Sequence, residues 1–576
     1  MDKHGERREY QSAYLRRTFR EGGKVRNETV ANLSALPAHV VDWVEAGLKG
    51  KSLVPADQAA TITRSVPHGH VAAVHAQAVA LGLPALLGPA GRHRDLALAL
   101  IISRVVHPGS KLATACWWDD TTLGVDLDVA GASTDEVYAA MDWLLGRQDA
   151  IEATLARRHL GPQANPSRMA LFDLSSAWME GSHCPLAKRG YSRDGKKNRT
   201  QIEYGLLTDP AGRPVAIRVF GGNTADPSAF IEAVKIVRDR FGLTAMVMVG
   251  DRGMVTSARI EALRADNADP DTDSDLGWLT ALRAPAIAKL AAQGGPLQPT
   301  LFDQQNLAEI AHPDYPGERL VACRNPFLAA ERARKRDELL AATETVLAPV
   351  VASVTAGRLH GADRIGLKIG KILNTYKMAK HFEVTITDTT LTITRRSEQI
   401  EAEAALDGIY VIRTTVPEHT LDAAGVVGAY KNLANVERDF RTIKVDDLDL
   451  RPIYHRLEDR VRAHVLIVML AAYLTWHLRR SLAPLTFTDQ DRPTRTDPVA
   501  PAQRSAAATR KASRRKDPDD QPVRSFRTLL DHLATLTRND IQYGPDGPVV
   551  PTLAVPTPTQ RRVFELLGTV IPLNLK

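Results

Sequence analysis

The arrangement of apolar and polar positions changes character several times along the 576-residue chain. Between 10 and 37, apolar residues are interleaved with arginines around Gly22-Gly23, and this pattern predicts a small β hairpin with a basic face. From about 65 to 160, apolar residues recur at spacings of three and four, which predicts helices. We therefore expect a basic arm at 1–60, followed by a helical domain at 61–165.

At 169 the periodicity becomes that of strands. The runs "MALFDLSSAW", "QIEYGLLTD" and "RPVAIRVFGGN" predict an antiparallel meander, because the turn "PAGR" separates the last two. A helix should follow, with Asp226 as its N-cap and Pro227 in its first turn. The apolar "AMVMVGD" then predicts a buried strand, and a helix and the strand "WLTALRA" come next. In this order the fourth strand can lie parallel beside the first, because the crossover between them must return right-handed.

The alternation of strands and helices breaks between about 285 and 405. A long helix leads into "HFEVTITDTTLTITRRS", whose period-two alternation predicts a hairpin. We expect a strand at 407–416 and a long helix at about 454–482. The stretch 483–524 is rich in Pro, Asp, Ser, Ala and Arg with little apolar content, which predicts a disordered linker. A helical tail is expected at 525–576.

Composition narrows the class of protein. Hydrophobic residues make up 44% and charged residues 24%, so neither a disordered chain nor a membrane protein is expected. The longest apolar run, 465–474, is half as long as a membrane span, and we interpret it as a buried helix. The N-terminus lacks the apolar core of a signal peptide, which favours a cytoplasmic protein. Cys116, Cys184 and Cys323 are far apart without metal-ligand spacing, so neither disulfides nor a zinc site is expected.

The net charge of +7 is unevenly distributed. The segment "KRGYSRDGKKNR" at 188–199 holds six basic residues and one acid, and "RKASRRK" at 510–516 holds five basic residues and no acid. Such clusters fit contact with a phosphate backbone, where each neutralised phosphate releases counterions. Solvated loops would explain either cluster equally well.

Two aspartates interrupt apolar segments. Asp173 lies within "MALFDLSS" and Asp251 ends "AMVMVGD". A buried acid must be paired, hydrogen-bonded or bound to a metal, although each aspartate taken singly could be a helix cap or turn residue. If the fourth strand lies parallel beside the first, the two are neighbours at the centre of the sheet and repel unless a cation lies between them. Oxygen ligands in a basic protein favour Mg²⁺ or Mn²⁺.

A third acid stands among basic residues in "GAYKNLANVERDFRTIK" at 428–444. On one α-helix, steps of three, four, four and three would place Tyr430, Leu433, Glu437, Arg441 and Lys444 on one face. If that face packs on the sheet, Glu437 would complete a site for two metal ions. A surface helix with acid–base pairs is the alternative.

Four motifs together resemble a known family. In order along the chain, "LFDLSS", "GGNTADPSAF", "MVGDRGM" and "YKNLANVERDFRTIK" resemble DDE transposases of bacterial insertion sequences. The branch, the insertion sequence four-like superfamily, carries the signature Tyr, two residues, Arg, three residues, Glu, six residues, Lys. Tyr430, Glu437 and Lys444 match this spacing, whereas Leu433 stands where the signature has Arg. Arg441 or Lys431 could take over the role of that arginine.

The resemblance implies an α/β fold with a ribonuclease H-like catalytic core, a mixed five-stranded sheet with helices. Its two parts would be at 166–285 and 406–482, interrupted by a β-rich insertion domain at 286–405 and preceded by the hairpin and a helical DNA-binding domain. Asp173, Asp251 and Glu437 would be the catalytic residues and the ligands of two Mg²⁺ or Mn²⁺ ions. The resemblance implies that Tyr430 and Lys444 contact DNA phosphates, and Arg441 could replace the missing arginine. Arg252 could contact a phosphate or pair with an acid. The basic cluster and the basic hairpin add further predicted DNA-binding residues, namely Lys188, Arg189, Lys196, Lys197, Arg16, Arg17 and Lys24.

The implied reaction is hydrolysis at the ends of the element, which frees a 3′-hydroxyl that attacks target DNA. The resemblance implies a homodimer that pairs inverted-repeat ends at the bacterial nucleoid, with no membrane partner. Some relatives stack a flipped base of a DNA hairpin on an aromatic residue; Trp278 could do this or could be a core residue. Two other functions stay open, namely a DNA-binding relative without catalysis and a host metal-dependent nuclease with the same core.

Overall fold

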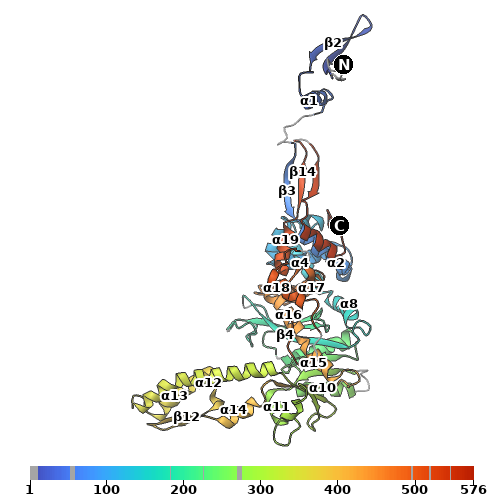
Figure 1. Cartoon of the computed structure of the whole chain (residues 1–576). Coiled ribbons are helices and arrows are strands. Elements are labelled where there is room, and N and C mark those ends of the chain that lie inside the picture. Colours follow the sequence, from blue (N-terminus) through green and yellow to red (C-terminus); the bar gives the residue numbers. More distant parts are fainter. Residues whose placement is uncertain are drawn as a thin grey trace. The chain divides into compact units, whose positions relative to one another are not determined.

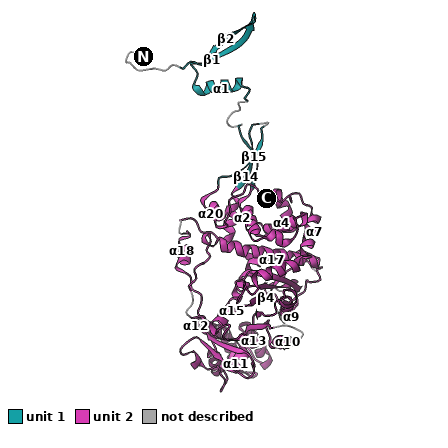
Figure 2. Cartoon of the chain, turned by 90° about the vertical axis from the view of Figure 1, so that its right-hand side faces the viewer, with its two compact units in different colours: residues 1–66, 537–555 teal, residues 67–536, 556–576 magenta. Residues whose placement is uncertain are grey.

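The computed structural model describes residues 11–51, 59–181, 183–196, 198–224, 226–268, 275–493, 497–517, 520–544 and 547–576 (Figure 1). The chain forms two compact units (Figure 2). Unit 1 comprises 1–66 and 537–555, and unit 2 comprises 67–536 and 556–576. Unit 2 carries all three acids predicted to be catalytic.

Unit 1 contains the predicted β hairpin. Its strands, β1 (Tyr14–Glu21) and β2 (Lys24–Asn32), pair antiparallel with Glu21 opposite Lys24. Gly22 and Gly23 form the turn with φ angles of 57° and 80°, which glycine adopts without the steric cost of a side chain. The hairpin prediction is therefore confirmed, and helix α1 (Ala38–Leu48) follows it.

Unit 1 also contains a three-stranded sheet in the order β15-β14-β3. Its strands are β3 (Thr61–Pro67), β14 (Thr537–Gln542) and β15 (Val549–Leu553). The prediction of a purely helical tail at 525–576 is thus wrong, although α19 (Phe526–Ala534) and α20 (Pro558–Leu566) lie within that segment. The short strand β14 gains its sheet partner β3 from the other end of the chain.

The helices predicted between 65 and 160 are present in unit 2. They are α2 (Gly69–Ala80), α3 (Leu83–Leu87), α4 (Arg92–Val106), α5 (Lys111–Trp118), α6 (Thr122–Asp126), α7 (Thr134–Leu145) and α8 (Gln148–His159). The long helix α17 (Glu458–Ser481) packs against α2, α4 and α7. Its apolar run 465–474 is buried, which confirms the interpretation as a buried helix.

The central sheet of unit 2 has eight strands in the order β6-β5-β4-β7-β8-β13-β10-β9. The predicted meander forms β4, β5 and β6, and β7 lies parallel between β4 and β8 as the crossover rule predicts. The prediction of a five-stranded sheet is wrong, because three more strands extend it: β13 pairs antiparallel with β8, and β10 and β9 follow. The strands are β4 (Met169–Trp178), β5 (Gln201–Thr208), β6 (Pro214–Gly221), β7 (Val247–Val249), β8 (Gly277–Ala281), β9 (Leu307–Ile310), β10 (Arg319–Arg324) and β13 (Ile409–Thr414).

Helices connect the parallel strands. The crossover from β6 to β7 contains the predicted helix, α9 (Asp226–Lys235), which begins one residue before the predicted start, and the π-helix η1 (Ile236–Arg240). Helix α10 (Ser257–Ala268) joins β7 to β8.

The segment 286–405 is mainly helical, in contrast to the predicted β-rich insertion. Its long helices α12 (Pro326–Thr355) and α13 (Ala362–Tyr376) run side by side and bury apolar residues such as Leu347 and Ile369 between them (Figure 1). The predicted hairpin is confirmed as β11 (Phe382–Ile386) and β12 (Leu391–Arg395). The remaining elements are α11 (Ala284–Leu290), η2 (Pro299–Phe302), η3 (Ala379–His381) and α14 (Ser397–Ala404).

In the part of the chain that the structure describes, two helices meet the length and apolarity of a membrane span. These are α12 and α17, and α4 with α5 would make a third, bent span. In the structure α17 packs within unit 2, and α12 packs along α13.

The segment 483–524, predicted to be disordered, contains the turn η5 (Ala483–Leu485) and helix α18 (Ala506–Arg514). Ser505 caps α18 by accepting a hydrogen bond from the Ala508 N–H, and the Lys511 Nζ donates to the Ala483 carbonyl at 3.1 Å. Such a cap stabilises a helix by about 1 kcal/mol. The low apolar content therefore misled the prediction, because polar contacts hold this segment.

Candidate active site

Asp173 and Asp251 lie at the same level of two adjacent parallel strands. In the β4–β7 register, Leu171 stands opposite Val249. Asp173 lies two residues further along β4, and Asp251 lies two residues past the end of β7. The register therefore brings the two aspartates to the same end of this strand pair. Asp173 Oδ1 accepts a hydrogen bond from the Leu174 N–H at 2.8 Å, and Asp251 Oδ1 accepts one from the Gly253 N–H at 2.7 Å.

Glu437 is held above these strands by helix α16 (Leu433–Arg441), which packs on β4. The helix buries Val436 and Phe440 against the sheet, and the Phe440 ring meets the Tyr204 ring edge-on with centroids 5.5 Å apart. This packing turns Glu437 toward the cavity that contains the two aspartates. The three acids predicted from the sequence therefore line one cavity.

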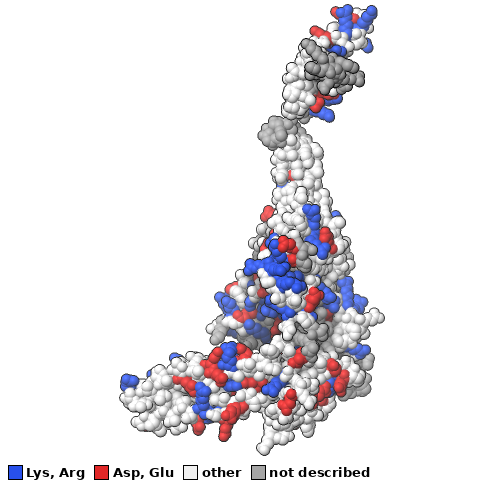
Figure 3. Space-filling model, viewed as in Figure 1, with Lys and Arg blue, Asp and Glu red and all other residues white. Residues whose placement is uncertain are grey.

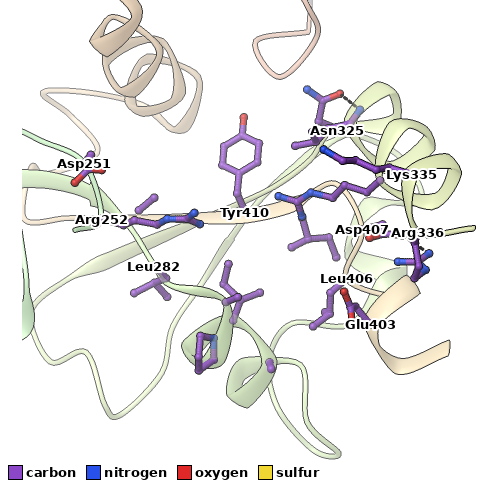
Figure 4. Close-up of a pocket in the computed structure, with 18 of the residues that line it drawn as sticks. Asp251, Arg252, Leu282, Asn325, Lys335, Arg336, Glu403, Leu406, Asp407 and Tyr410 are labelled. Atoms are coloured by element: carbon purple, nitrogen blue, oxygen red, sulfur yellow. Dashed lines mark hydrogen bonds and ion pairs between the residues drawn. The ribbon is translucent and has the colours of Figure 1, made fainter. Parts of the chain in front are cut away.

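The shared cavity has a volume of about 1250 Å³. Tyr430, from α15 (Ala423–Lys431), and Leu433 line it beside Glu437, and Arg252 lines it beside Asp251. Figure 4 shows Arg252 extended into the cavity from the end where Asp251 lies. Five residues that the sequence predicts to bind DNA or metal therefore line this cavity, together with Leu433, which carries no charge.

The acids in the cavity influence one another. Burial, together with the negative charges of Asp251 and Glu437, raises the pKa of Asp173 to about 7, while the Leu174 N–H and Arg193 act in the opposite direction. Burial and the same three acids also raise the pKa of Tyr430 above its ordinary value. The cavity therefore concentrates negative charge that favours protonation of Asp173 or the approach of a cation.

The donor chemistry of the cavity fits a hard divalent cation. Asp173, Asp251 and Glu437 offer carboxylate oxygens, which are the ligands that Mg²⁺ and Mn²⁺ prefer, and a cation would relieve the repulsion that raises the pKa of Asp173. Among the residues that the structure describes, no three His, Cys, Asp or Glu side chains form a ready-made metal cluster. The chain thus provides carboxylates around a common space, and their side chains would have to turn inward to share an ion.

The prediction that five residues from Tyr430 to Lys444 share one helical face is wrong. The helix is interrupted at Asn432, between α15 and α16, and continues after Arg441 as the π-helix η4 (Thr442–Asp446). Because a π-helix has more residues per turn than an α-helix, the predicted spacing no longer holds beyond Arg441. Arg441 is exposed and lies outside the cavity.

Lys444, which is predicted to contact DNA phosphates, forms a buried ion pair outside the cavity. Its Nζ lies 2.8 Å from Asp194 Oδ1, and the Arg451 guanidinium also pairs with that carboxylate. Only 2% of the Asp194 side chain is exposed. Burial lowers the pKa of Lys444.

Lys431 does not replace the arginine that the signature has at position 433. Its Nζ donates hydrogen bonds to the carbonyl oxygens of Pro498, Val499 and Ala500, at 2.5, 2.8 and 3.1 Å. These bonds attach α15 to the chain beyond α17. A lysine used in this way has little freedom to meet a phosphate.

The basic loop between β4 and β5 exposes Lys188, Arg189 and Lys196 to solvent. Lys196 Nζ lies 5.9 Å from the centre of the Trp178 ring, a cation–π contact. Lys197 falls outside the described residues. The predicted DNA contacts of this loop remain predictions, as do those of Arg16, Arg17 and Lys24, which are exposed on the hairpin of unit 1.

The segment after β8 supplies a basic wall that the sequence reasoning missed. Arg332 and Lys335 on α12 and Lys377 after α13 line the cavity, and none of them forms an ion pair with a described residue. Figure 4 shows Lys335 at the end of the cavity opposite to Asp251. The spacing of three between Arg332 and Lys335 was the available signal, because it places both on one side of a helix.

Trp278 is a core residue. It lies on β8 and is 1% exposed, with the Arg264 guanidinium 5.3 Å from its ring centre. The structure therefore supports a role for Trp278 in the core rather than in stacking on a flipped base.

The fold defines a mixed α/β protein with a large mixed sheet, and its cavity combines the three predicted acids, together with Glu403 and Asp407, with a basic wall. Residues 2–56 match the family model for the N-terminal domain of IS1634 family transposases. This match supports an insertion-sequence transposase, and thus an enzyme that processes DNA. No curated protein matches the chain.

One solved structure with some similarity is a cryo-electron microscopy structure of the piggyBac transposase synaptic complex with hairpin DNA. It shares 9% sequence identity, covers 71% of this chain and 72% of its own, and has a TM-score of 0.31. A TM-score this low carries no argument about the fold or the site.

Proposed function

We propose that the chain is a DDE transposase that cleaves DNA at the inverted-repeat ends of its element and joins them to target DNA. The observation that carries the proposal is the convergence of Asp173, Asp251 and Glu437, from β4, the end of β7 and α16, on one cavity. The match of residues 2–56 to an insertion-sequence transposase domain supports the same conclusion independently.

The sheet supports a ribonuclease H-like core. Its strands β6-β5-β4 run antiparallel and β4-β7-β8 run parallel, so the first strand of the meander occupies the centre. Asp173 lies on that central strand and Asp251 follows its parallel neighbour. Ligands bind preferentially at the carboxyl ends of such parallel strands.

Asp173, Asp251 and Glu437 would hold two Mg²⁺ or Mn²⁺ ions. When bound, the ions supply stabilisation of the attacking and leaving oxygens of a phosphodiester. The basic side chains that line the cavity would bind phosphates of the DNA. Arg252 lies next to the carboxylates and can hold the phosphate that enters there, while Arg332 and Lys335 can hold phosphates at the far end of the cavity.

The role of Tyr430 follows from its place in the cavity that the acids and Arg252 also line. Its hydroxyl stays protonated because burial and the neighbouring acids raise its pKa, so it can donate a hydrogen bond to a phosphate oxygen. We further propose that the protein acts as a homodimer on paired ends, in the bacterial cytoplasm at the nucleoid.

The test uses a duplex that carries the inverted repeats flanking the gene, a random duplex of equal length, and Mg²⁺. The wild type should cut the repeat duplex preferentially, while Glu437→Gln should bind it without cutting. The matched control is Glu401→Gln, because Glu401 is exposed on α14 and lies outside the cavity. Equal cutting of both duplexes would indicate a host nuclease, and binding without cutting by the wild type would indicate a non-catalytic relative.

A further inference from the structure

Helix α16 separates two cavities. Glu437 lines the one with the aspartates, whereas Asn435, Arg438 and Asp439 line a second cavity of about 980 Å³. Because Asn435 and Asp439 lie nearly half a turn away from Glu437 around the helix, the two cavities occupy opposite sides of α16. The second cavity lies between α16, α17 and the segment after η5.

Arginines dominate the charge of this second cavity, which we name the arginine groove. Its charged lining residues are Arg438, Arg479, Arg480, Arg492 and Arg504 together with Asp439, Asp489 and Asp491. Arg441, Arg479 and Arg492 are close enough to Arg438 for their charges to repel its own. Like charges gathered at one place are destabilising unless an anion joins them.

Most of these arginines have no acidic partner among the described residues. Arg438, Arg480, Arg492 and Arg504 form no ion pair with any residue that the structure describes, and only Arg479 pairs, with Asp447. Asp489 lines the groove and could pair with an arginine, but its carboxylate accepts hydrogen bonds from Ser505 instead. The Ser505 N–H donates at 2.9 Å and the Ser505 hydroxyl at 2.7 Å. The groove therefore keeps several guanidinium groups free for an external anion.

The buried floor of the groove also has unused hydrogen-bonding atoms. Arg479 Nε and Asp439 Oδ2 are buried and have no hydrogen-bond partner within the described ranges. A buried donor left unpaired destabilises the folded protein. A bound ligand with oxygen acceptors would satisfy the arginine.

Aromatic side chains accompany the arginines. Arg213 and Arg480 lie over the Trp476 ring, at 5.2 and 5.5 Å from its centre, which fixes the direction of both guanidinium groups. Phe487 lines the groove and is 46% exposed. Free guanidinium groups next to an exposed aromatic ring are the composition of surfaces that follow a nucleic-acid strand.

We propose that the arginine groove binds the sugar–phosphate backbone of DNA at a place separate from the cleavage cavity. The inference rests on the proposed function, because it takes DNA as the ligand. The basic cluster at 510–516, in and after α18, continues the positive surface, and Figure 3 shows Lys and Arg side chains gathered over α17 and α18. Helix α16 would then contact one DNA molecule from both sides.

The experiment measures DNA binding by the full chain in EDTA, with a labelled single strand and the matching duplex, over a series of salt concentrations. Arg438→Gln/Arg492→Gln should lower the slope of log affinity against log salt by about 1.4 for the single strand or about 1.8 for the duplex, since two phosphate contacts are lost. Arg358→Gln/Lys368→Gln is the control, because both residues are exposed on the helical insertion without ion pairs among the described residues.

Arg492→Gln alone provides a second variant, because Arg492 is exposed and its replacement disturbs no packing. It should lower the slope by about half as much. Unchanged slopes with both probes, in variants that unfold at the wild-type temperature, would overturn the groove inference. Since the measurement excludes divalent ions, this failure is distinct from a failure of the proposed function, which would appear as absent Mg²⁺-dependent cleavage by the wild type.

Discussion

Replacement of Asp173 by Asn should stabilise the protein at high pH and much less at low pH. The ionised carboxylate is unfavourable in the folded cavity because it is buried and faces Asp251 and Glu437. Asn has nearly the same size but no charge. The variant therefore removes the electrostatic cost and leaves the packing of β4 unchanged.

The magnitude follows from the pKa. A rise from the ordinary value of 3.8 to about 7 corresponds to about 4 kcal/mol, because one pKa unit is worth about 1.4 kcal/mol. The folded state binds this proton more tightly than the unfolded state, so the contribution to stability is present below about pH 4 and is lost as the pH rises through 7. Between pH 5 and pH 8, the advantage of Asp173→Asn over the wild type should grow by about 3 kcal/mol.

Thermal unfolding of both proteins at pH 5 and pH 8 measures this advantage, with Glu401→Gln as the control for an exposed carboxylate. Addition of Mg²⁺ or Mn²⁺ at pH 8 should stabilise the wild type and leave Asp173→Asn unchanged, since a cation favours the ionised carboxylate. An advantage that is the same at both pH values would refute the reasoning, because it would mean that Asp173 does not titrate near 7.

Two further predictions concern the surroundings of the site. Arg332→Ala/Lys335→Ala should lower the salt slope for duplex binding by about 1.8, because two phosphate contacts disappear; a wild-type slope would contradict the proposed role of the basic wall. Asp194→Ala should lower the free energy of unfolding by about 3 kcal/mol, because Lys444 and Arg451 would be left as buried cations without their shared partner. Denaturant unfolding measures this loss, and a change below about 1 kcal/mol would show that the pair contributes little.

The central strands of the fold could be predicted because the sequence patterns that determine them lie within short segments of the chain. The runs that form β4, β5 and β6 are bounded by turn residues, and the crossover rule alone places β7 beside β4. The convergence of Asp173 and Asp251 follows from that placement. Glu437 could be predicted for a similar reason, since α16 has a clearly amphipathic pattern with Val436 and Phe440 on its buried side.

The remaining features depend on contacts between distant segments. β13 joins the sheet through pairs such as Ile412 with Ala281, and no local pattern indicates which strand it will meet. The direction of Lys444 depends on the π-helix η4 and on Asp194, a residue in a loop far away in the sequence. The basic wall belongs to helices whose position against the sheet is set by tertiary packing.

The most direct test of the three-carboxylate site is the rate of Mg²⁺-dependent cleavage of the repeat duplex by Asp173→Asn, Asp251→Asn, Glu437→Gln and the triple variant. If the three residues act as one unit, each single replacement should lower the rate by at least about 1,000-fold, and the triple variant should be no slower than the slowest single one. A single variant that cleaves at the wild-type rate, or losses that multiply in the triple variant, would contradict the account.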